Sequence, residues 1–339
     1  MAKIKGEYVP VLAKVYAKNV TPEIIDGSIT EVSAGLLDGV TQIKAGIFYG
    51  CRNLYRVTIP DNIEAINVLA FYACYGLKEL TLGNNLKIIG SSAFSNCIAL
   101  PEVTIPNSVT SIGSNAFHTC LGLTEITIPD SVTEIGEYAF ASCENLEDIT
   151  LSKNITKINN GTFWSCKKLK EIDIPEGVTA IEYAGIRGCR SLRRITLPST
   201  LEKIGGYAFE FDESLTEITI PNSVTEIGEY SFYSCTGLSE ITIPNSVTII
   251  GDGAFYLCSN LVKATVGENV TEIGDYALTN CTSLREVTVL AKTPPKISWT
   301  TCYGAAEDFK IYVPAQSVEA YKSAEVWSYK ADYIFAIEE

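Results

Sequence analysis

The chain has 339 residues, 46% of them hydrophobic, and a formal net charge of −14 at pH 7. Binding to nucleic acid or to anionic membranes is disfavoured, because both need a basic protein surface. The hydrophobic fraction is sufficient for a continuous core, so the composition indicates a globular chain.

Residues 1–37 are predicted to form an N-terminal cap that covers the open end of a repeat array. The apolar run at residues 8–13 is too short for a secretion signal, and no export route is evident. Pro10 stands near the start of a short amphipathic helix. The apolar positions of this helix are Val11, Leu12, Val15 and Tyr16. Residues 29–32 resemble the second extended stretch of the repeat and are interpreted as a half-rung.

Residues 38–290 consist of eleven copies of a 23-residue unit, with no insertion or deletion. The copy that begins at Leu123 has the sequence LTEITIPDSVTEIGEYAFASCEN. A leucine, an isoleucine, an aromatic residue and a cysteine recur at fixed positions in nearly every copy; Asp212 replaces the cysteine in one. So strict a period indicates a solenoid in which each copy forms one rung.

Each rung is predicted to contain two extended stretches and a turn. The LxxIxI stretch, as at Leu123, Ile126 and Ile128, is typical of a strand with one buried face. A proline such as Pro129 ends that strand, because it has no N–H for the ladder. A second stretch ends near Ile135, and the alanine, aromatic residue and cysteine that follow fit one helical or 3₁₀ turn. No rung can bury these side chains alone, so the rungs must stack.

Residues 291–339 are predicted to form a C-terminal cap, because two prolines at positions 294 and 295 break the period. A last strand is expected at residues 309–314, and a helix at residues 317–324 with Ser317 as its N-cap. The apolar stripe of this helix would consist of Ala320, Tyr321, Ala324 and Trp327.

The combined pattern LxxLxLPxxLxxIxxxAFxxCxx resembles the BspA-like, or Treponema-type, class of bacterial leucine-rich repeats, over about three quarters of the chain. The resemblance implies a right-handed, curved leucine-rich repeat solenoid. Short parallel strands would line its concave face, with turns and short helical or 3₁₀ segments on the convex side. It also implies adhesion and protein binding, usually at bacterial cell surfaces, and related repeats occur in prophage proteins.

The cysteines are predicted to be reduced, because those of the repeat column occupy core positions beside one another. Zinc binding is disfavoured, since there is no CxxC motif and only one histidine. That histidine, His118, occupies a variable position, and Cys120 is predicted to point inward, so a catalytic pair is not expected. We therefore predict no enzyme activity, no metal site and no cofactor.

Partner-binding residues are predicted on the outward-facing side of the first strand. The position before the buried strand residue is acidic in most copies, and the next outward position is nearly always threonine. Neighbouring acids about 5 Å apart repel by ~0.8 kcal/mol even in water, which favours a role in binding. The alternative is solvated charge beside β-branched residues that suit a sheet. The proposed residues are Glu79, Glu102, Glu125, Asp148, Glu171, Arg194, Thr127 and Thr150.

A second candidate patch lies in the rungs between residues 153 and 221, which depart most from the consensus. The register stacks Trp164 beside Arg187, which allows a cation–π pair. Neutral drift of surface positions is the alternative explanation for the basic residues. The patch consists of Trp164, Lys167, Arg187 and Arg190.

Two functions follow from these observations. The first is a non-catalytic binding or adhesion module that presents a concave, acidic, threonine-rich sheet to a protein or glycan partner, outside the cell or at its surface. The alternative is a structural or receptor-binding component of a phage or prophage tail, favoured by the missing secretion signal and the self-contained caps. Neither involves nucleic acid or membrane insertion.

Overall fold

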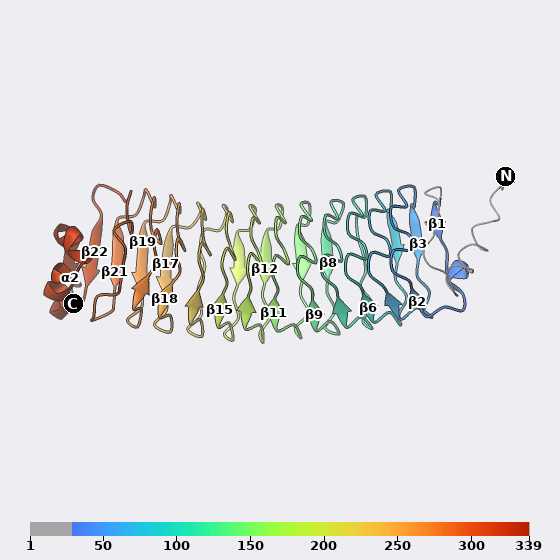
Figure 1. The fold of residues 1–339 in the computed structure, drawn as a ribbon, viewed down its shortest axis with the longest axis horizontal. Coiled ribbons are helices and arrows are strands. Elements are labelled where there is room, and N and C mark those ends of the chain that lie inside the picture. Colours follow the sequence, from blue (N-terminus) through green and yellow to red (C-terminus); the bar gives the residue numbers. More distant parts are fainter. Residues whose placement is uncertain (1–28, 339) are drawn as a thin grey trace. The chain divides into compact units, whose positions relative to one another are not determined.

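The computed structural model describes residues 29–338, which form a parallel β-solenoid with a 23-residue repeat. The strands fall into two compact units. The first unit consists of the described residues up to Ile155 together with Ser165–Lys167. The second unit consists of Thr156–Trp164 and the described residues from Lys168 onward. In each unit most rungs contribute one short strand to a first-strand column and another to a second-strand column (Figure 1).

In the first unit, neighbouring strands are parallel and in register, so that Val57 lies opposite Leu80, for example. The first-strand column contains β1 (Glu31–Val32), β3 (Arg56–Thr58) and β5 (Glu79–Thr81) in one sheet, and β8 (Glu125–Thr127) and β10 (Asp148–Thr150) in another. The second-strand column is the sheet of β2 (Gln42–Ile43), β4 (Ala65–Ile66), β6 (Ile88–Ile89), β7 (Ser111–Ile112) and β9 (Glu134–Ile135). The 3₁₀ helix η1 (Ala34–Leu37) connects β1 to β2.

The second unit repeats this arrangement and ends in short helices. Its first-strand column contains the pair β12 (Glu171–Asp173) and β14 (Arg194–Thr196), and the sheet of β17 (Glu240–Ile243), β19 (Lys263–Val266), β21 (Glu286–Val289), β22 (Lys310–Val313) and β23 (Ile334–Ala336). Its second-strand column contains β11 (Lys157–Ile158), β13 (Ala180–Ile181), β15 (Lys203–Ile204), β16 (Glu226–Ile227), β18 (Ile249–Ile250) and β20 (Glu272–Ile273). The helices are η2 (Ala315–Ser317), α2 (Val318–Ser323) and η3 (Trp327–Tyr333).

The core consists of the side chains that the repeat places at fixed positions. In the first unit, adjacent rings of the aromatic column stack with centroids 5.0 to 5.5 Å apart; they are Phe48, Phe71, Phe94, Phe117 and Phe140. In the second unit, Phe232 stacks between Phe209 and Phe255 at 5.1 Å. Burial of one such ring contributes roughly 2–3 kcal/mol, and only a neighbouring rung can supply that burial.

The cysteine column is a ladder of buried thiols, as predicted. From Cys74 to Cys281, the sulfur of each repeat cysteine donates a hydrogen bond to the carbonyl of a phenylalanine on the preceding rung, for example Cys74 to Phe48 at 3.2 Å and Cys258 to Phe232 at 3.1 Å. All eleven cysteines are free and buried in the described part of the chain. Cys302, which lies outside the 23-residue repeat, is also buried, because its turn packs beside Leu278 on an additional rung.

The segment around each core aromatic consists of turns rather than the expected helical turn. Between η1 and η2 the structure assigns no helix to the described residues. Non-glycine residues with positive φ, such as Tyr138 (55°) and Ser142 (58°), recur on either side of the aromatic position. Each reverses the chain locally, which keeps the rung short but strains an L-residue by roughly 1–2 kcal/mol.

The N-terminal segment forms a rung of its own. β1 pairs with β3, with Glu31 opposite Arg56, so residues 29–32 belong to the first-strand column. Their interpretation as a half-rung of the second stretch was wrong. Ile29 and Val32 have a three-residue spacing that both stretches of the repeat share, so spacing could not separate the two. The helix predicted at residues 11–16 lies outside the described residues.

The C-terminal segment adds two strands and the predicted helix. The strand expected at residues 309–314 is β22, but it is not the last, because β23 pairs with it after η3. α2 confirms the helix, although the Ser317 side chain makes no capping hydrogen bond. Within the expected stripe Tyr321 and Trp327 are buried, whereas Ala320 is exposed. Because both ends add rungs, residues 29–338 form about 13 turns rather than eleven.

Asp212 places a carboxyl group in the buried cysteine column. Its Oδ1 accepts a hydrogen bond from the Cys189 N–H at 2.7 Å, whereas Oδ2 has no partner among the described residues. Burial raises the pKa of Asp212 well above its ordinary value, and burial also raises the pKa of Glu210, two residues earlier. The folded chain therefore holds the Asp212 proton at pH values where the unfolded chain releases it. Stability must fall as the pH rises from about 4 through the folded-state pKa.

The first prediction concerns this carboxyl group. Asp212→Cys restores the column and removes an unpartnered buried oxygen, so it should stabilise the protein at pH 8 by about 1–3 kcal/mol. The gain should shrink toward pH 4, where the carboxyl group is protonated in the folded state and in roughly half of the unfolded chains. Urea unfolding of both proteins between pH 4 and 8 measures this difference. Asp332→Asn, which removes an exposed acid, is the control; an Asp212→Cys profile parallel to wild type would contradict the prediction.

The second prediction concerns thiol reactivity. Burial raises the pKa of Cys143 to about 12 and that of Cys302 to about 11, so native thiols should react slowly with a thiol reagent. Cys302 should react first, because it is the most exposed at 9% and Lys330 partly offsets the rise in its pKa. Titration should find one early thiol that Cys302→Ser removes, and the other thiols only after denaturation. A low thiol count in denatured, unreduced protein would instead reveal disulfides.

Candidate functional site

The candidate residues of the first-strand column point away from the core. In β8 the middle residue, Ile126, is buried, while Glu125 and Thr127 on either side are exposed. This follows from the alternation of side chains along a strand. Within each unit the fold therefore forms one row of mostly acidic residues and a parallel row of threonines. The assignment of this face as concave stays a prediction.

In the first unit the acidic row contains two opposed carboxylates. Glu125 lies opposite Asp148 in the β8–β10 ladder, and Thr127 lies opposite Thr150. All four side chains belong to exposed residues. Among the residues that the structure describes, neither carboxylate has a cationic partner. Their mutual repulsion is therefore not compensated within this part of the chain.

The other two candidate acids of the first unit, Glu79 and Glu102, are not opposed carboxylates. Glu79 forms an ion pair with Arg56 across β3 and β5, with Nε 2.5 Å from Oε2. The hydrogen bond from Arg56 lowers the pKa of Glu79. Glu102 is exposed but lies outside the assigned strands, at a gap in the column. Of the candidate acids in this unit, Glu125 and Asp148 are thus the two that a sheet holds together.

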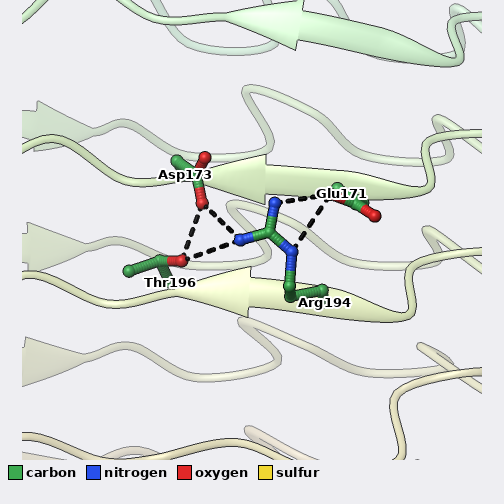
Figure 2. A network of polar contacts seen from close by, with 4 residues as sticks. All are labelled: Glu171, Asp173, Arg194 and Thr196. Carbon is green, nitrogen blue, oxygen red and sulfur yellow. Dashed lines mark hydrogen bonds and ion pairs between the residues drawn. The ribbon is translucent and has the colours of Figure 1, made fainter.

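In the second unit Arg194 adds a cation to the acidic row and pairs with Glu171 and Asp173 (Figure 2). Its guanidinium donates from Nε and Nη2 to Glu171, with the Nε contact at 3.0 Å, and from Nη1 to Asp173 at 3.0 Å. The Thr196 hydroxyl donates to Asp173 at 2.7 Å and also accepts from Nη1 at 3.3 Å. The hydrogen bond with Glu171 and the two carboxylate charges raise the pKa of Arg194. This part of the row is an internally satisfied network.

The second unit also has a groove of about 470 Å³ that sequence reasoning missed. It lies along the first-strand column, where Glu217 and Thr219 of one rung and Glu240 and Thr242 of the next line it. The structure assigns no strand to residues 217–219, so the column is interrupted beside β17. In the sequence, the only signal for these groove residues is that they occupy the same outward-facing repeat positions as Glu125 and Thr127.

The second candidate patch contains a packed cluster around Arg187. The guanidinium lies 5.8 Å from the centre of the Trp164 ring, which confirms the predicted cation–π contact. It also lies 5.9 Å from Tyr207 and from Phe211, and its Nε is 2.5 Å from a Glu210 carboxylate oxygen. The Glu210 side chain is only 5% exposed. The positive charge of Arg187 is therefore compensated inside the cluster by the Glu210 carboxylate.

The other two basic residues of this patch also have acidic partners. Lys167 pairs with Glu144 at 2.6 Å, and Arg190 pairs with Glu213 at 3.6 Å. Each partner is 23 residues away, one rung along. The register alone could have indicated these pairs.

The arrangement around His118 does not form a catalytic pair. His118 Nδ1 lies 2.9 Å from the Thr119 hydroxyl, while the Cys120 sulfur donates to the Phe94 carbonyl at 3.3 Å. Burial lowers the pKa of His118 and raises that of Cys120, so both side chains favour their neutral forms at pH 7. Over residues 29–338 no three His, Cys, Asp or Glu side chains gather as a metal site would require. In the same range, no helix has the length and apolar character to cross a membrane.

Solved structures with the same architecture come from several bacteria. A leucine-rich repeat protein from Bacteroides ovatus is 28% identical, with a TM-score of 0.67 over 88% of both chains. A leucine rich cell surface protein from Faecalibacterium prausnitzii is also 28% identical, with a TM-score of 0.50 over 74% of this chain and 76% of that one. The pneumococcal vaccine antigen PcpA, at 21% identity, shares the fold with a TM-score of 0.56 over 88% of this chain and 85% of its own. A search of curated proteins found no match.

The repeat itself matches a family model described as the BspA type leucine rich repeat region. Six copies of that region are recognised, over residues 27–143, 87–213 and 186–300. These overlapping ranges span most of the sequence and include nearly all of the rungs described above. The chain therefore belongs to the family of BspA-type leucine-rich repeat proteins.

Proposed function

We propose that this chain is a non-catalytic binding module whose first-strand column contacts a protein or glycan partner. The observation that carries the proposal is the uncompensated carboxylate pair of Glu125 and Asp148, beside the hydroxyls of Thr127 and Thr150. A partner that brings cations or hydrogen-bond donors would relieve the repulsion between the carboxylates. The ladder fixes the backbone from which all four side chains project, which lowers the entropic cost of binding.

Family and fold support this proposal. Leucine-rich repeat proteins generally bind protein partners, and stacked sheets provide wide faces on which many modest contacts add up. One of the similar structures is a cell surface protein, which favours a role in adhesion at or outside a cell surface. No observation bears on the phage-tail alternative, which stays a prediction.

The third prediction tests the first-strand column. Glu125→Lys combined with Asp148→Lys should slow association with a partner and change its salt dependence, because rim charges act mainly on the rate of encounter. The substituted positions are exposed, so the stability should stay within about 0.5 kcal/mol of wild type. The probes are arrays of immobilised glycans and of purified surface and matrix proteins. Association rates with each probe that binds wild type are then measured at two salt concentrations.

The matched control combines Glu134→Lys, in β9 of the second-strand column, with Glu202→Lys, just before β15. It changes the net charge by the same amount as the Glu125 and Asp148 variant. It should bind as wild type does. Equal losses in both double variants would show a non-specific charge effect and contradict the proposed face. Normal binding by the Glu125 and Asp148 variant, with loss on Trp164→Ala, would assign binding to the second patch instead. Failure of wild type to bind any probe would count against the proposed module.

A further inference from the structure

The turns of the second unit carry a row of aromatic side chains at the protein surface. Tyr230 contacts Tyr233 at 5.9 Å between ring centroids, Tyr233 stacks on Tyr256 at 5.4 Å, and Tyr256 contacts Tyr276 at 6.2 Å. Three of the rings are partly exposed, and Tyr276 is 45% exposed. These four residues are called the tyrosine strip below.

Exposed aromatic side chains continue beyond the tyrosine strip on the next rung. The Asn280 N–H donates to the Tyr303 carbonyl at 2.7 Å, which places residues 298–303 on the next rung. That rung adds Trp299 and Tyr303, which are 72% and 64% exposed. Large aromatic residues with this exposure on consecutive rungs are unusual in a surface that contacts only water.

Carboxylates accompany the strip rung by rung. Glu229, Asp252 and Asp275 occupy equivalent exposed positions, and Asp252 accepts a hydrogen bond from the Asp275 N–H at 2.8 Å. Within residues 29–338 none of the three forms an ion pair. The ammonium group of Lys296 pairs with Glu272 at 2.8 Å, and this hydrogen bond is the main reason why the pKa of Lys296 is raised. The charges of Asp275 and Asp252 raise that pKa less. The strip therefore combines electron-rich ring faces with unpaired negative charge.

Another cluster in the second unit shows that aromatic rings together with a carboxylate can hold a guanidinium. On the adjoining rungs Arg187 lies within 6 Å of the Trp164, Tyr207 and Phe211 rings and pairs with the Glu210 carboxylate. Tyr207 in turn stacks on Tyr230, the first ring of the strip, at 5.2 Å. At one end of this surface an internal guanidinium thus pairs with a carboxylate, whereas over the following described rungs Glu229, Asp252 and Asp275 have no ion-pair partner, because Lys296 pairs with Glu272.

The first ring of the strip, that of Tyr230, is held in place by its packing on Gly253. A Cβ atom at Gly253 would lie 2.3 Å from Tyr230 Cε1, so the ring of Tyr230 occupies the space that this glycine leaves. Gly253 has the same positive φ (59°) that Tyr230 (50°) and Tyr276 (60°) adopt on the neighbouring rungs. A side chain at position 253 would displace the ring. The strip is therefore a preformed surface rather than a set of independent side chains.

We infer that the tyrosine strip, with Glu229, Asp252 and Asp275, binds an arginine-bearing extended segment of a partner protein. Each guanidinium would lie over a ring face and pair with a carboxylate, as Arg187 does internally. In an extended peptide, alternate side chains on one face are about 6.8 Å apart. Neighbouring rings of the strip are 5.4 to 6.2 Å apart, so flexible arginine side chains can reach successive rings. A neutral sugar could stack on the rings but would leave the carboxylates without counter-charge. The inference does not depend on the first-strand column.

The fourth prediction tests the strip with a fluorescein-labelled octapeptide of alternating arginine and glycine. Fluorescence anisotropy in about 50 mM salt should show saturable binding that weakens as salt rises. Asp252→Asn with Asp275→Asn should weaken it by about tenfold or more, while the amide oxygen introduced at position 252 can still accept from the N–H of residue 275. Tyr233→Leu with Tyr256→Leu should weaken it about fivefold at unchanged charge. Thermal melts verify that both variants fold.

The matched control, Glu202→Gln with Glu307→Gln, removes two exposed acids away from the strip and should keep the wild-type affinity. An equal loss in this control would reduce the effect to net charge and overturn the inference. Unchanged binding in the tyrosine variant would do the same, because it would remove the rings from the site. Binding of cellohexaose that the tyrosine variant abolishes, without binding of the peptide, would make the strip a sugar-binding surface instead.

Discussion

A single rung of this protein cannot bury its own apolar side chains, and most of the structure follows from that constraint. The ring of Phe117 is covered only because Phe94 and Phe140 stack on its two faces. The same holds for the thiols of the column: those of Cys120 and Cys143, for example, each donate to a carbonyl on the preceding rung. Stability must therefore come largely from interfaces between neighbouring rungs, as is expected for a repeat array.

The end of such a stack needs a cover. At the C-terminal end of the second unit β22, β23 and the helices α2 and η3 follow the repeat (Figure 1). Tyr321 of α2 and Trp327 of η3 are buried there. Their polar atoms are satisfied, because the Tyr321 hydroxyl donates to the Ala291 carbonyl and the Trp327 indole N–H to the Pro295 carbonyl, both at 2.7 Å. Large aromatic residues with a polar group can thus close the core without leaving an unpaired donor.

The strict register that packs the core also fixes the electrostatics of the surface. Within the strict repeat, a residue in the sheet lies beside the residue 23 positions away, so one substitution decides whether a pair attracts or repels. Arg194 beside Glu171 gives the network of Figure 2, whereas Asp148 beside Glu125 gives two opposed carboxylates. The departures from consensus in the second unit, from Arg187 to Asp212, place charge inside or against the core. There the rings of Tyr207 and Phe211 surround a guanidinium.

The sequence by itself determined the period, the inward-facing columns and the reduced thiols, because every rung obeys the same burial requirement. It also allowed the contact of Trp164 with Arg187 to be predicted, since the register places them side by side.

The sequence could not locate the breaks in the strands. The heptapeptide LTEITIP occurs at residues 123–129 and again at residues 215–221, yet only the first copy contains a strand, β8. Nor could it assign residues 29–32 to a column, because both stretches of the repeat share one apolar spacing. Strand pairing depends on the neighbouring rungs rather than on the heptapeptide, so only the tertiary structure decided where the sheet is continuous and where it opens into the groove beside Glu217.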